Sequence, residues 1–184
     1  MRRADLERLL RAAGRVIGAD QIIVVGSQAI LATIPEFMLP VEATMSVEAD
    51  LIPLDGTEAL ADQIDGAIGE ASMFHETFGV YAQGVGYETI TAPDGWRDRL
   101  IAYSNDNTDG VTGLCLEIND LWLAKLSAGR PKDFEFCRAL VQARLITPDI
   151  VRARAPTIDP RSDPAELAAR VERLLGNNGP TSRS

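Results

Sequence analysis

The sequence predicts an α/β (α+β) fold with short strands, flanking helices and a helical C-terminal part. Three observations lead to this fold class. Short apolar runs bounded by Gly or Pro, such as residues 22–25, predict buried strands. Apolar residues at helical spacing, as in residues 4–17, predict amphipathic helices. After about residue 118, the apolar positions recur at helical spacing.

Predicted helices and strands alternate along the N-terminal part of the chain. Gly18 ends the first helix, and Pro35 and Pro53 end the second helix and the second strand. In order, we expect a helix at 4–17, a strand at 21–25, a short helix at 28–33, a loop at 36–44, a strand at 46–52, a helix at 57–68, a Gly-rich and mainly strand-like region at 73–105 (best strands 80–82 and 99–103), and a strand at 111–118.

Local signals place the boundaries of the C-terminal helices. Asn119 or Asp120 is expected to cap the first of them. Gly129-Arg130-Pro131 breaks that helix, and its proline suits the first position of the next helix. The segment 163–166, Asp-Pro-Ala-Glu, has the pattern of a capping box and opens a last helix.

Composition limits the architecture and the class of function. The chain has 184 residues, of which 46% are hydrophobic and 24% charged, so we expect one domain at 1–155 and a C-terminal helix with a disordered tail at 156–184. No apolar run is long enough for a membrane span. The net charge of −9 argues against broad binding to nucleic acid but leaves room for a short contact with an RNA end.

The few cysteines and the single histidine exclude other kinds of site. Cys115 and Cys137 fall in apolar patterns, which predicts buried, reduced thiols and a cytoplasmic protein. His75 alone cannot build a zinc site and is expected to be structural.

Two acidic residues in a predicted strand form the first chemical motif. Glu48 and Asp50 are two positions apart, so their side chains share one face of the strand. Adjacent carboxylates repel and stay ionised together when a cation lies between them. Such oxygen ligands suit Mg²⁺, or Mn²⁺, bound together with substrate phosphates. Gly26-Ser27, directly after the first strand, offers close backbone approach and amide donors for a phosphate.

Basic residues gather at a predicted helix–helix junction. Lys125, Arg130 and Lys132 lie within nine residues, together with Asp133. Lys132 falls in the first turn of a helix, where a cation opposes the helix dipole. An acidic protein that places cations in this way is expected to meet an anion such as a triphosphate.

Each motif also has a purely structural interpretation. An acid pair on an edge strand is commonly a solvated face, and Lys125 alone would be a surface lysine. Asp133 alone would be an acid that stabilises the first turn of its helix.

In this order, the motifs resemble the nucleotidyltransferases of the polymerase beta superfamily, in particular the minimal bacterial group with AbiEii-type and MenT-type toxins. The resemblance rests on the Gly-Ser turn, the acid-x-acid strand and the Lys-x₄-Arg-x-Lys-Asp segment. An uncharacterised branch of this group is also similar at residues 68–70, 74–79 and 93–100. In all, the resemblance covers roughly residues 20–145.

The resemblance implies a short mixed sheet flanked by helices and a Mg²⁺-bound NTP whose nucleotidyl group passes to an acceptor hydroxyl. The acceptor would be an RNA end, such as that of tRNA, or a protein, and the chain would be the toxin of a toxin–antitoxin pair with an antitoxin partner. The residues matched to the family are Gly26 and Ser27 for the phosphate turn, Glu48 and Asp50 for the metal, Lys125, Arg130 and Lys132 for the phosphates, and Asp133 for the metal shell or the proton.

A second hypothesis keeps the fold without strong catalysis. Position 48 has Glu where Asp is common in the family, and the chain is acidic overall. Both features are also compatible with a binding module that acts as the partner of a toxin or antitoxin.

Overall fold

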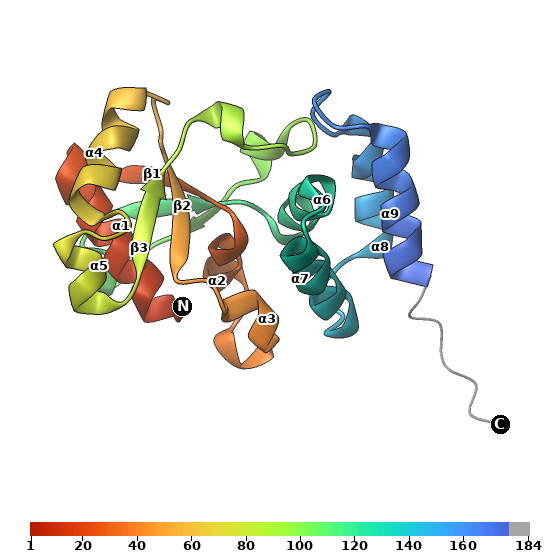
Figure 1. The fold of residues 1–184 in the computed structure, drawn as a ribbon, viewed down its shortest axis with the longest axis horizontal. Coiled ribbons are helices and arrows are strands. Elements are labelled where there is room, and N and C mark those ends of the chain that lie inside the picture. The colour runs from red at the N-terminus through yellow and green to blue at the C-terminus, as the bar shows by residue number, and fades with distance from the viewer. Residues whose placement is uncertain (177–184) are drawn as a thin grey trace.

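The computed structural model describes residues 1–176 and confirms the predicted fold class: a mixed five-stranded sheet flanked by helices, with a helical C-terminal part (Figure 1). In chain order, the elements are α1 (Arg3–Ile17), β1 (Gln21–Val25), α2 (Ile30–Thr33), α3 (Val41–Thr44), β2 (Glu48–Pro53), α4 (Glu58–Ile68), α5 (Met73–Phe78), β3 (Tyr81–Gly84), β4 (Ile101–Tyr103), β5 (Thr112–Cys115), α6 (Ile118–Ala128), α7 (Pro131–Gln142), α8 (Pro148–Arg154) and α9 (Pro164–Gly176).

The strand order in the sheet is β3-β2-β1-β5-β4. β1 runs antiparallel to β2 and parallel to β5, β2 runs parallel to β3, and β4 runs antiparallel to β5. The central position of β1 explains its continuous apolar run, because both of its faces are covered.

The two faces of the sheet differ in character. One face, which includes Ala49, Leu51 and Ala82, is buried, and α1 and α4 pack near it. Two glycines permit this close packing: a Cβ on Gly113 would lie 2.8 Å from Leu10 Cδ1, and one on Gly84 would lie 2.0 Å from the Ala61 carbonyl oxygen. The other face carries Glu48 and Asp50, which alternate with the buried positions.

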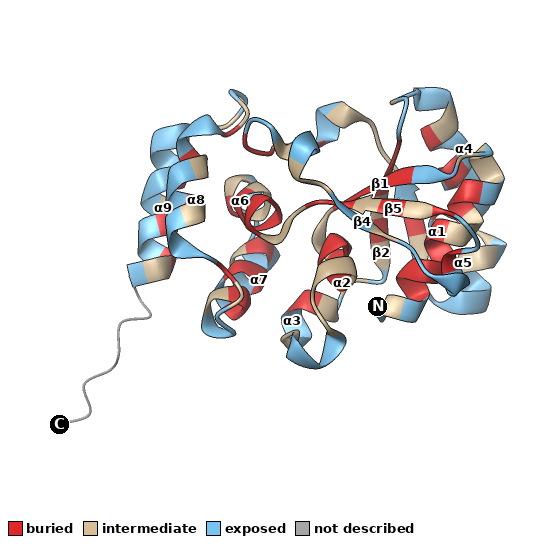
Figure 2. Cartoon of the chain, turned by 180° about the vertical axis from the view of Figure 1, so that it is seen from behind, coloured by how far each residue is buried: buried red, intermediate tan, exposed pale blue. Residues whose placement is uncertain are grey.

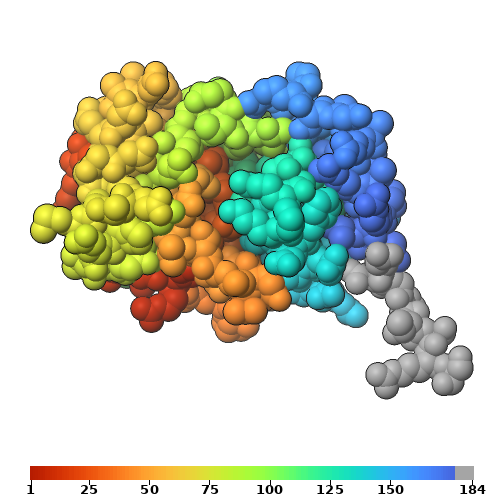
Figure 3. Space-filling view, in the orientation of Figure 1, coloured from red at the N-terminus to blue at the C-terminus, as the bar shows by residue number. Residues whose placement is uncertain are grey.

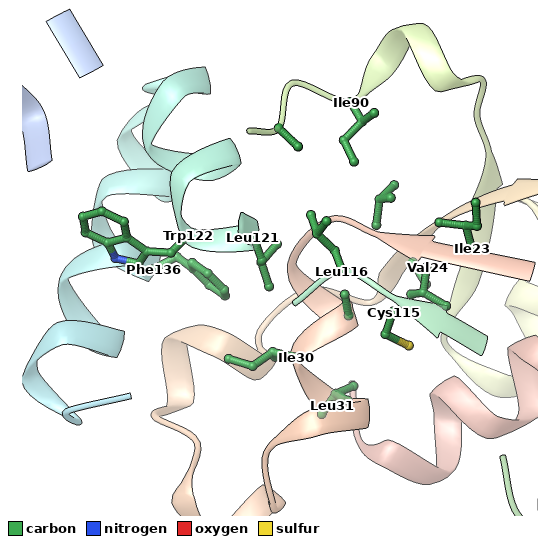
Figure 4. Close-up of a cluster of buried hydrophobic side chains, with 14 of the residues drawn as sticks. Ile23, Val24, Ile30, Leu31, Ile90, Cys115, Leu116, Leu121, Trp122 and Phe136 are labelled. Atoms are coloured by element: carbon green, nitrogen blue, oxygen red, sulfur yellow. The ribbon is translucent and has the colours of Figure 1, made fainter. Parts of the chain in front are cut away.

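The apolar core continues from the sheet into the C-terminal helices (Figure 2). Figure 4 shows Leu116, directly after β5, near Leu121 of α6. Farther along, Trp122 is fully buried, and its indole nitrogen donates to the Cys137 carbonyl oxygen at 3.0 Å. Both cysteines are free and buried, as predicted, and burial raises the pKa of the Cys115 thiol to about 12.

The region at 73–105 differs from the prediction of mainly strand. Met73–Phe78 is helix α5, because Ser72 Oγ accepts from the His75 amide at 3.1 Å and Gly79 ends the helix in the left-handed conformation. Residues 96–99 form a 3-10 turn, so the strand predicted at 99–103 begins only at Ile101. The loop predicted at 36–44 contains α3.

The helix caps near α6 and α9 also need correction. The N-cap of α6 is Glu117, whose carboxylate accepts from the amides of Asn119 and Asp120. At α9, Asp163 accepts from two amides as expected, but Glu166 pairs with Arg170 in place of closing the capping box. The predicted disordered tail lies outside the described residues, except Gly176, which ends α9.

Asp120 has a structural role that its predicted capping role did not suggest. It is fully buried and accepts from Arg99 Nε at 2.7 Å and from Arg154 Nη1 at 2.9 Å. Arg154 also donates to Glu117 at 2.6 Å. These ion pairs join α6 to α8 and to the turn before β4.

Contacts also cross residue 155, the boundary predicted between the domain and its C-terminal part. Pro93 pairs with Ile158 in an isolated bridge, and the Asp94 amide donates to the Thr157 carbonyl oxygen at 2.8 Å. The Arg161 guanidinium donates to the carbonyl oxygens of Glu88 and Ile90. The segment after α8 therefore supports the loop at 85–92. None of the helices in residues 1–176 has the length and apolar character that a membrane span needs.

Candidate functional site

Gly26 and Asp50 are in direct contact where β1 ends. Gly26 has φ +68° and ψ −176°, a conformation that side chains rarely adopt. A Cβ at this position would lie 1.9 Å from Asp50 Oδ2, so the Asp50 carboxylate occupies the space that any larger residue would fill. The register explains this contact, because Val25 of β1 is paired with Asp50 of β2. Glycine is therefore required here by both backbone conformation and space.

A buried side chain within the turn after Gly26 ties this turn to its neighbours. Ser27–Ala29 forms a 3-10 turn, and its middle residue, Gln28, is almost fully buried. Gln28 Nε2 donates to Ser27 Oγ at 3.2 Å and to the Ala43 carbonyl oxygen at 3.3 Å, which ties the turn to α3. Ser27 is thereby held in place next to the acid-bearing strand.

Glu48 and Asp50 lie on one face of β2, as the strand period requires, with the buried Ala49 between them. Burial, followed by the negative charge of Glu48, raises the pKa of Asp50 to about 6. The charges of Lys125, Arg130 and Lys132 act in the opposite direction on the same pKa. The fold thus brings the basic cluster to the acid pair, although about seventy-five residues separate them in the sequence.

Helix geometry orients the basic cluster. Lys125 is in the last turn of α6, which ends at Gly129 in the left-handed conformation. Arg130 is the N-cap of α7, and Pro131 is its first residue. This sharp junction turns the chain so that residues from both helices face the same space.

Asp133 binds the basic cluster itself. It is 2% exposed, and its carboxylate accepts from Arg130 Nε at 2.7 Å and lies 3.6 Å from Lys125 Nζ. It also accepts from the Arg130 amide at 3.3 Å, as an acid in the first turn of a helix does. We expected Asp133 to complete the metal shell or to take the proton. Its contacts in the structure are those of a counter-ion that orients Lys125 and Arg130, and its role toward a metal ion or the proton stays a prediction.

Three hollows surround these residues, and Figure 3 shows the hollowed face between the orange segment of β2 and α3 and the teal α6 and α7. The first, of about 290 Å³, is lined by Gly26, Asp50, Lys125 and Arg130 together with apolar side chains such as Val85 and Ile90. The second, of about 260 Å³, is lined by Ser27, Lys125, Lys132 and Asp133. The third, of about 490 Å³, is lined by Glu48, Tyr81 and Gln83, among others.

The predicted site residues thus gather around Lys125 and Asp50. Lys125 lines both the first and the second hollow, so it connects Asp50 and Gly26 to Ser27 and Lys132. Glu48 faces the third hollow, on the side of β3.

The donor set suits a hard divalent cation only in part. Glu48 and Asp50 supply carboxylate oxygens, which Mg²⁺ and Mn²⁺ prefer. In residues 1–176, no group of three His, Cys, Asp or Glu side chains could hold a metal ion. The pair therefore fits Mg²⁺ bound with one or two carboxylates, its remaining ligands coming from water and substrate phosphate.

Two side chains of β3 belong to this site and were not predicted. Tyr81 is paired with Glu48 in the sheet, and its hydroxyl donates to Glu48 Oε2 at 3.3 Å. Gln83 is paired with Asp50 and lines both the first and the third hollow. The strand at 80–82 was predicted, but the register that places its side chains beside the acid pair is not visible in the sequence.

The comparisons with known proteins agree with this geometry. Residues 4–162 match the family described as "Nucleotidyltransferase of unknown function (DUF6036)". The chain belongs to this family. No curated protein and no solved structure matches the chain.

The DUF6036 match supports the nucleotidyltransferase family that the motifs indicated. It includes Gly26, both acids of β2 and the whole basic cluster, and it extends to Arg161, which supports the loop at 85–92. The more specific resemblance to AbiEii-type and MenT-type toxins stays a prediction.

Proposed function

We propose that this DUF6036 protein transfers a nucleotidyl group from an NTP to an acceptor hydroxyl, with Mg²⁺ or Mn²⁺ bound by Glu48 and Asp50. The observation that carries the proposal is the contact of Gly26 with Asp50 directly beside Lys125 and Arg130. Backbone, carboxylate and cations are the groups that a metal-bound triphosphate needs, and Gly26, Asp50, Lys125 and Arg130 supply them in one hollow, with Glu48 next to Asp50 on the same strand face.

Each residue has a role that follows from its position. Gly26 leaves room for the Asp50 carboxylate at the start of the turn, and Ser27 offers an amide and a hydroxyl to the phosphates. Lys125, Arg130 and Lys132 balance the negative charge of the triphosphate, while Asp133 keeps Lys125 and Arg130 in place. A bound metal ion would supply charge neutralisation at the α-phosphate and at the leaving pyrophosphate.

The shape of the first hollow supports a place for the base and ribose. Apolar side chains of Val85, Ile90 and Leu121 line it beside the polar groups. A nucleoside fits such a hollow through its flat apolar base, while its phosphates extend toward Lys125.

The acceptor is proposed to be a hydroxyl of an RNA end or of a protein, in a cytoplasmic setting where the two buried cysteines stay reduced. The role of a toxin controlled by an antitoxin is part of the same proposal. It rests on the motifs of the sequence.

Two experiments, performed one after the other, test the proposed function. Calorimetry first measures the binding of each NTP with Mg²⁺, with Mn²⁺ and with EDTA. We expect binding that requires the metal and is lost in Asp50→Asn. In contrast, Asp62→Asn, which changes an exposed acid of α4, should bind as the wild type does. Binding of no NTP in the presence of either metal would refute the proposal.

The second experiment asks for transfer. Each labelled NTP is incubated with the protein, Mg²⁺ and either total RNA or cell lysate, and the labelled molecule is identified. The alternative function is a binding module with weak or no catalysis, and it is in keeping with Glu48 at a position where Asp is common in the family. Metal-dependent binding without any labelled product would select that alternative.

A further inference from the structure

The groups around the acid pair are divided between its two sides. Gly26, Lys125 and Arg130 lie with Asp50 around the first hollow, on the side of β1 and α6. Tyr81 belongs to β3, the neighbour of β2 on the opposite side from β1, and lines the third hollow but not the first. The groups that suit phosphate and the Tyr81 side chain therefore flank the acid pair from different directions.

This arrangement has a consequence for nucleotidyl transfer, and the inference rests on the proposed function. In phosphoryl-type transfer, the attacking and the leaving oxygen lie roughly in line with the phosphorus. With the triphosphate over Gly26 and the basic cluster, the pyrophosphate leaves on that side. The attacking hydroxyl then has to come from the side of β3, where the third hollow opens.

Tyr81 already presents a hydroxyl at this place. In residues 1–176, it is the only hydroxyl group that is hydrogen-bonded to a carboxylate of the acid pair, with 3.3 Å between Tyr81 Oη and Glu48 Oε2. Its ring packs against the imidazole of His75 with 4.7 Å between the ring centroids, and it lines the third hollow. The phenol is thus both positioned by its neighbours and open to the hollow.

The charge of the third hollow favours an acceptor that the chain itself carries. Glu48, Asp65 and Glu70 line it, so a polyanion such as an RNA end enters it only against their negative charge. A tyrosine fixed on β3 does not have to be attracted into the hollow, because the fold places it there. It also gains from proximity, which replaces a bimolecular encounter by an intramolecular one.

We propose that Tyr81 is an acceptor for the protein's own nucleotidyl transfer. A bond forms between Tyr81 Oη and the α-phosphorus of the NTP as the bond from that phosphorus to the pyrophosphate oxygen breaks. The phenol proton passes to water in the hollow, and pyrophosphate leaves. The product is a phosphodiester of Tyr81 that occupies the hollow and blocks in-line attack by any other hydroxyl. Self-modification would therefore limit transfer to external acceptors.

Intact-mass spectrometry of the purified protein, incubated with Mg²⁺ and each NTP in turn, tests this proposal. We expect a mass increase of one nucleoside monophosphate, mapped to the peptide with Tyr81, which is one of three tyrosines in the chain. The adduct should be absent from Tyr81→Phe and from Asp50→Asn. It should be retained in Tyr87→Phe. In the wild type, the Tyr87 hydroxyl donates to the Leu54 carbonyl oxygen, and Tyr87 lines none of the three hollows.

Calorimetry with Mg²⁺ and NTP on the same samples distinguishes a failure of Tyr81 self-modification from a failure of the proposed function. Binding without an adduct, or an adduct that persists in Tyr81→Phe, overturns the inference and leaves the proposed function standing. Loss of transfer to an external acceptor in Tyr81→Phe, with no adduct in the wild type, also overturns it, because Tyr81 would then only position Glu48. The absence of metal-dependent binding overturns both.

Discussion

Replacing Asp50 by Asn should make the metal-free protein more stable while removing its metal-dependent binding. The pKa of Asp50 is raised from 3.8 to about 6, first by burial and then by the charge of Glu48. At 1.36 kcal/mol per pKa unit, the ionised carboxylate costs at most about 3 kcal/mol of unfolding free energy. Because the side chain is only partly buried and is screened by solvent, we expect a gain of about 1–2 kcal/mol in Asp50→Asn.

The pH dependence of this gain follows from the sign of the pKa shift. The folded state binds the Asp50 proton more tightly than the unfolded state, so wild-type stability falls as the pH rises from about 4 to about 6. The variant has no titratable carboxyl group at position 50. Its advantage should therefore be absent below about pH 4 and complete above about pH 7, where it corresponds to roughly 2–8 °C in melting temperature.

Urea unfolding in EDTA over this pH range measures the effect. Asp62→Asn is an exposed control, and its unfolding free energy should follow that of the wild type at every pH. Adding Mg²⁺ and NTP should reverse the order of stability. A ligand at one hundred times its Kd stabilises the wild type by about 2.7 kcal/mol, and the variant gains nothing from it. An Asp50→Asn protein that is less stable than the wild type at neutral pH without metal would refute the reasoning about burial and repulsion at this site.

Three further predictions test other contacts. Gly26→Ala should abolish metal-dependent NTP binding in calorimetry, because its Cβ would displace the Asp50 carboxylate. In the control Gly18→Ala, the glycine has φ +65° and nothing within 4 Å of the added Cβ, so the variant should lose only about 1–2 kcal/mol of unfolding free energy and bind normally. Lys125→Ala should weaken NTP binding by about 1.5–3 kcal/mol, and Lys132→Ala should weaken it while slightly raising the melting temperature; unchanged Kd values would exclude both cations from the site. Asp120→Asn should lower the urea unfolding free energy by about 3–5 kcal/mol, and a loss below about 1 kcal/mol would contradict its role as a buried counter-ion.

Local chemistry made much of the fold predictable. Alternation along a strand placed Glu48 and Asp50 on one face, and the apolar run at 22–25 correctly indicated the central strand β1. The Gly129-Arg130-Pro131 break also fell where α6 ends and α7 begins. In each case the deciding interaction lies within a few residues, so the sequence contains it.

The misassigned segments are those in which short-range signals were weak or competed. Ser72 and Gly79 carry the cap signals of α5, but the helix between them is only six residues long and its aromatic residues also favour strands. Glu117 caps α6 ahead of two residues that are themselves common caps, so composition alone could not select it.

The site depended on tertiary structure to a different degree for each residue. The basic residues and Asp133 could be identified from the sequence, but the ion pairs that Asp133 makes with Lys125 and Arg130 were not predicted. The pair with Arg130 is three residues apart and local, which favours the simple interpretation of an acid in the first turn of a helix. Tyr81 could not be predicted at all, because its contact with Glu48 depends on the register of β2 with β3.

The segment after residue 155 shapes the site, although it contributes no residue to the acid pair or to the basic cluster. Arg161 donates to the carbonyl oxygens of Glu88 and Ile90 and is itself held by Asp159 at 2.8 Å. Ile90 lines the hollow that contains Asp50 and Lys125. One wall of the first hollow is therefore fixed by the Arg161 guanidinium, which lies in the segment after α8. The family match includes this residue and ends at 162, directly before the last helix. The segment from α8 to Arg161 is thus part of the family match and of the structure that shapes the first hollow.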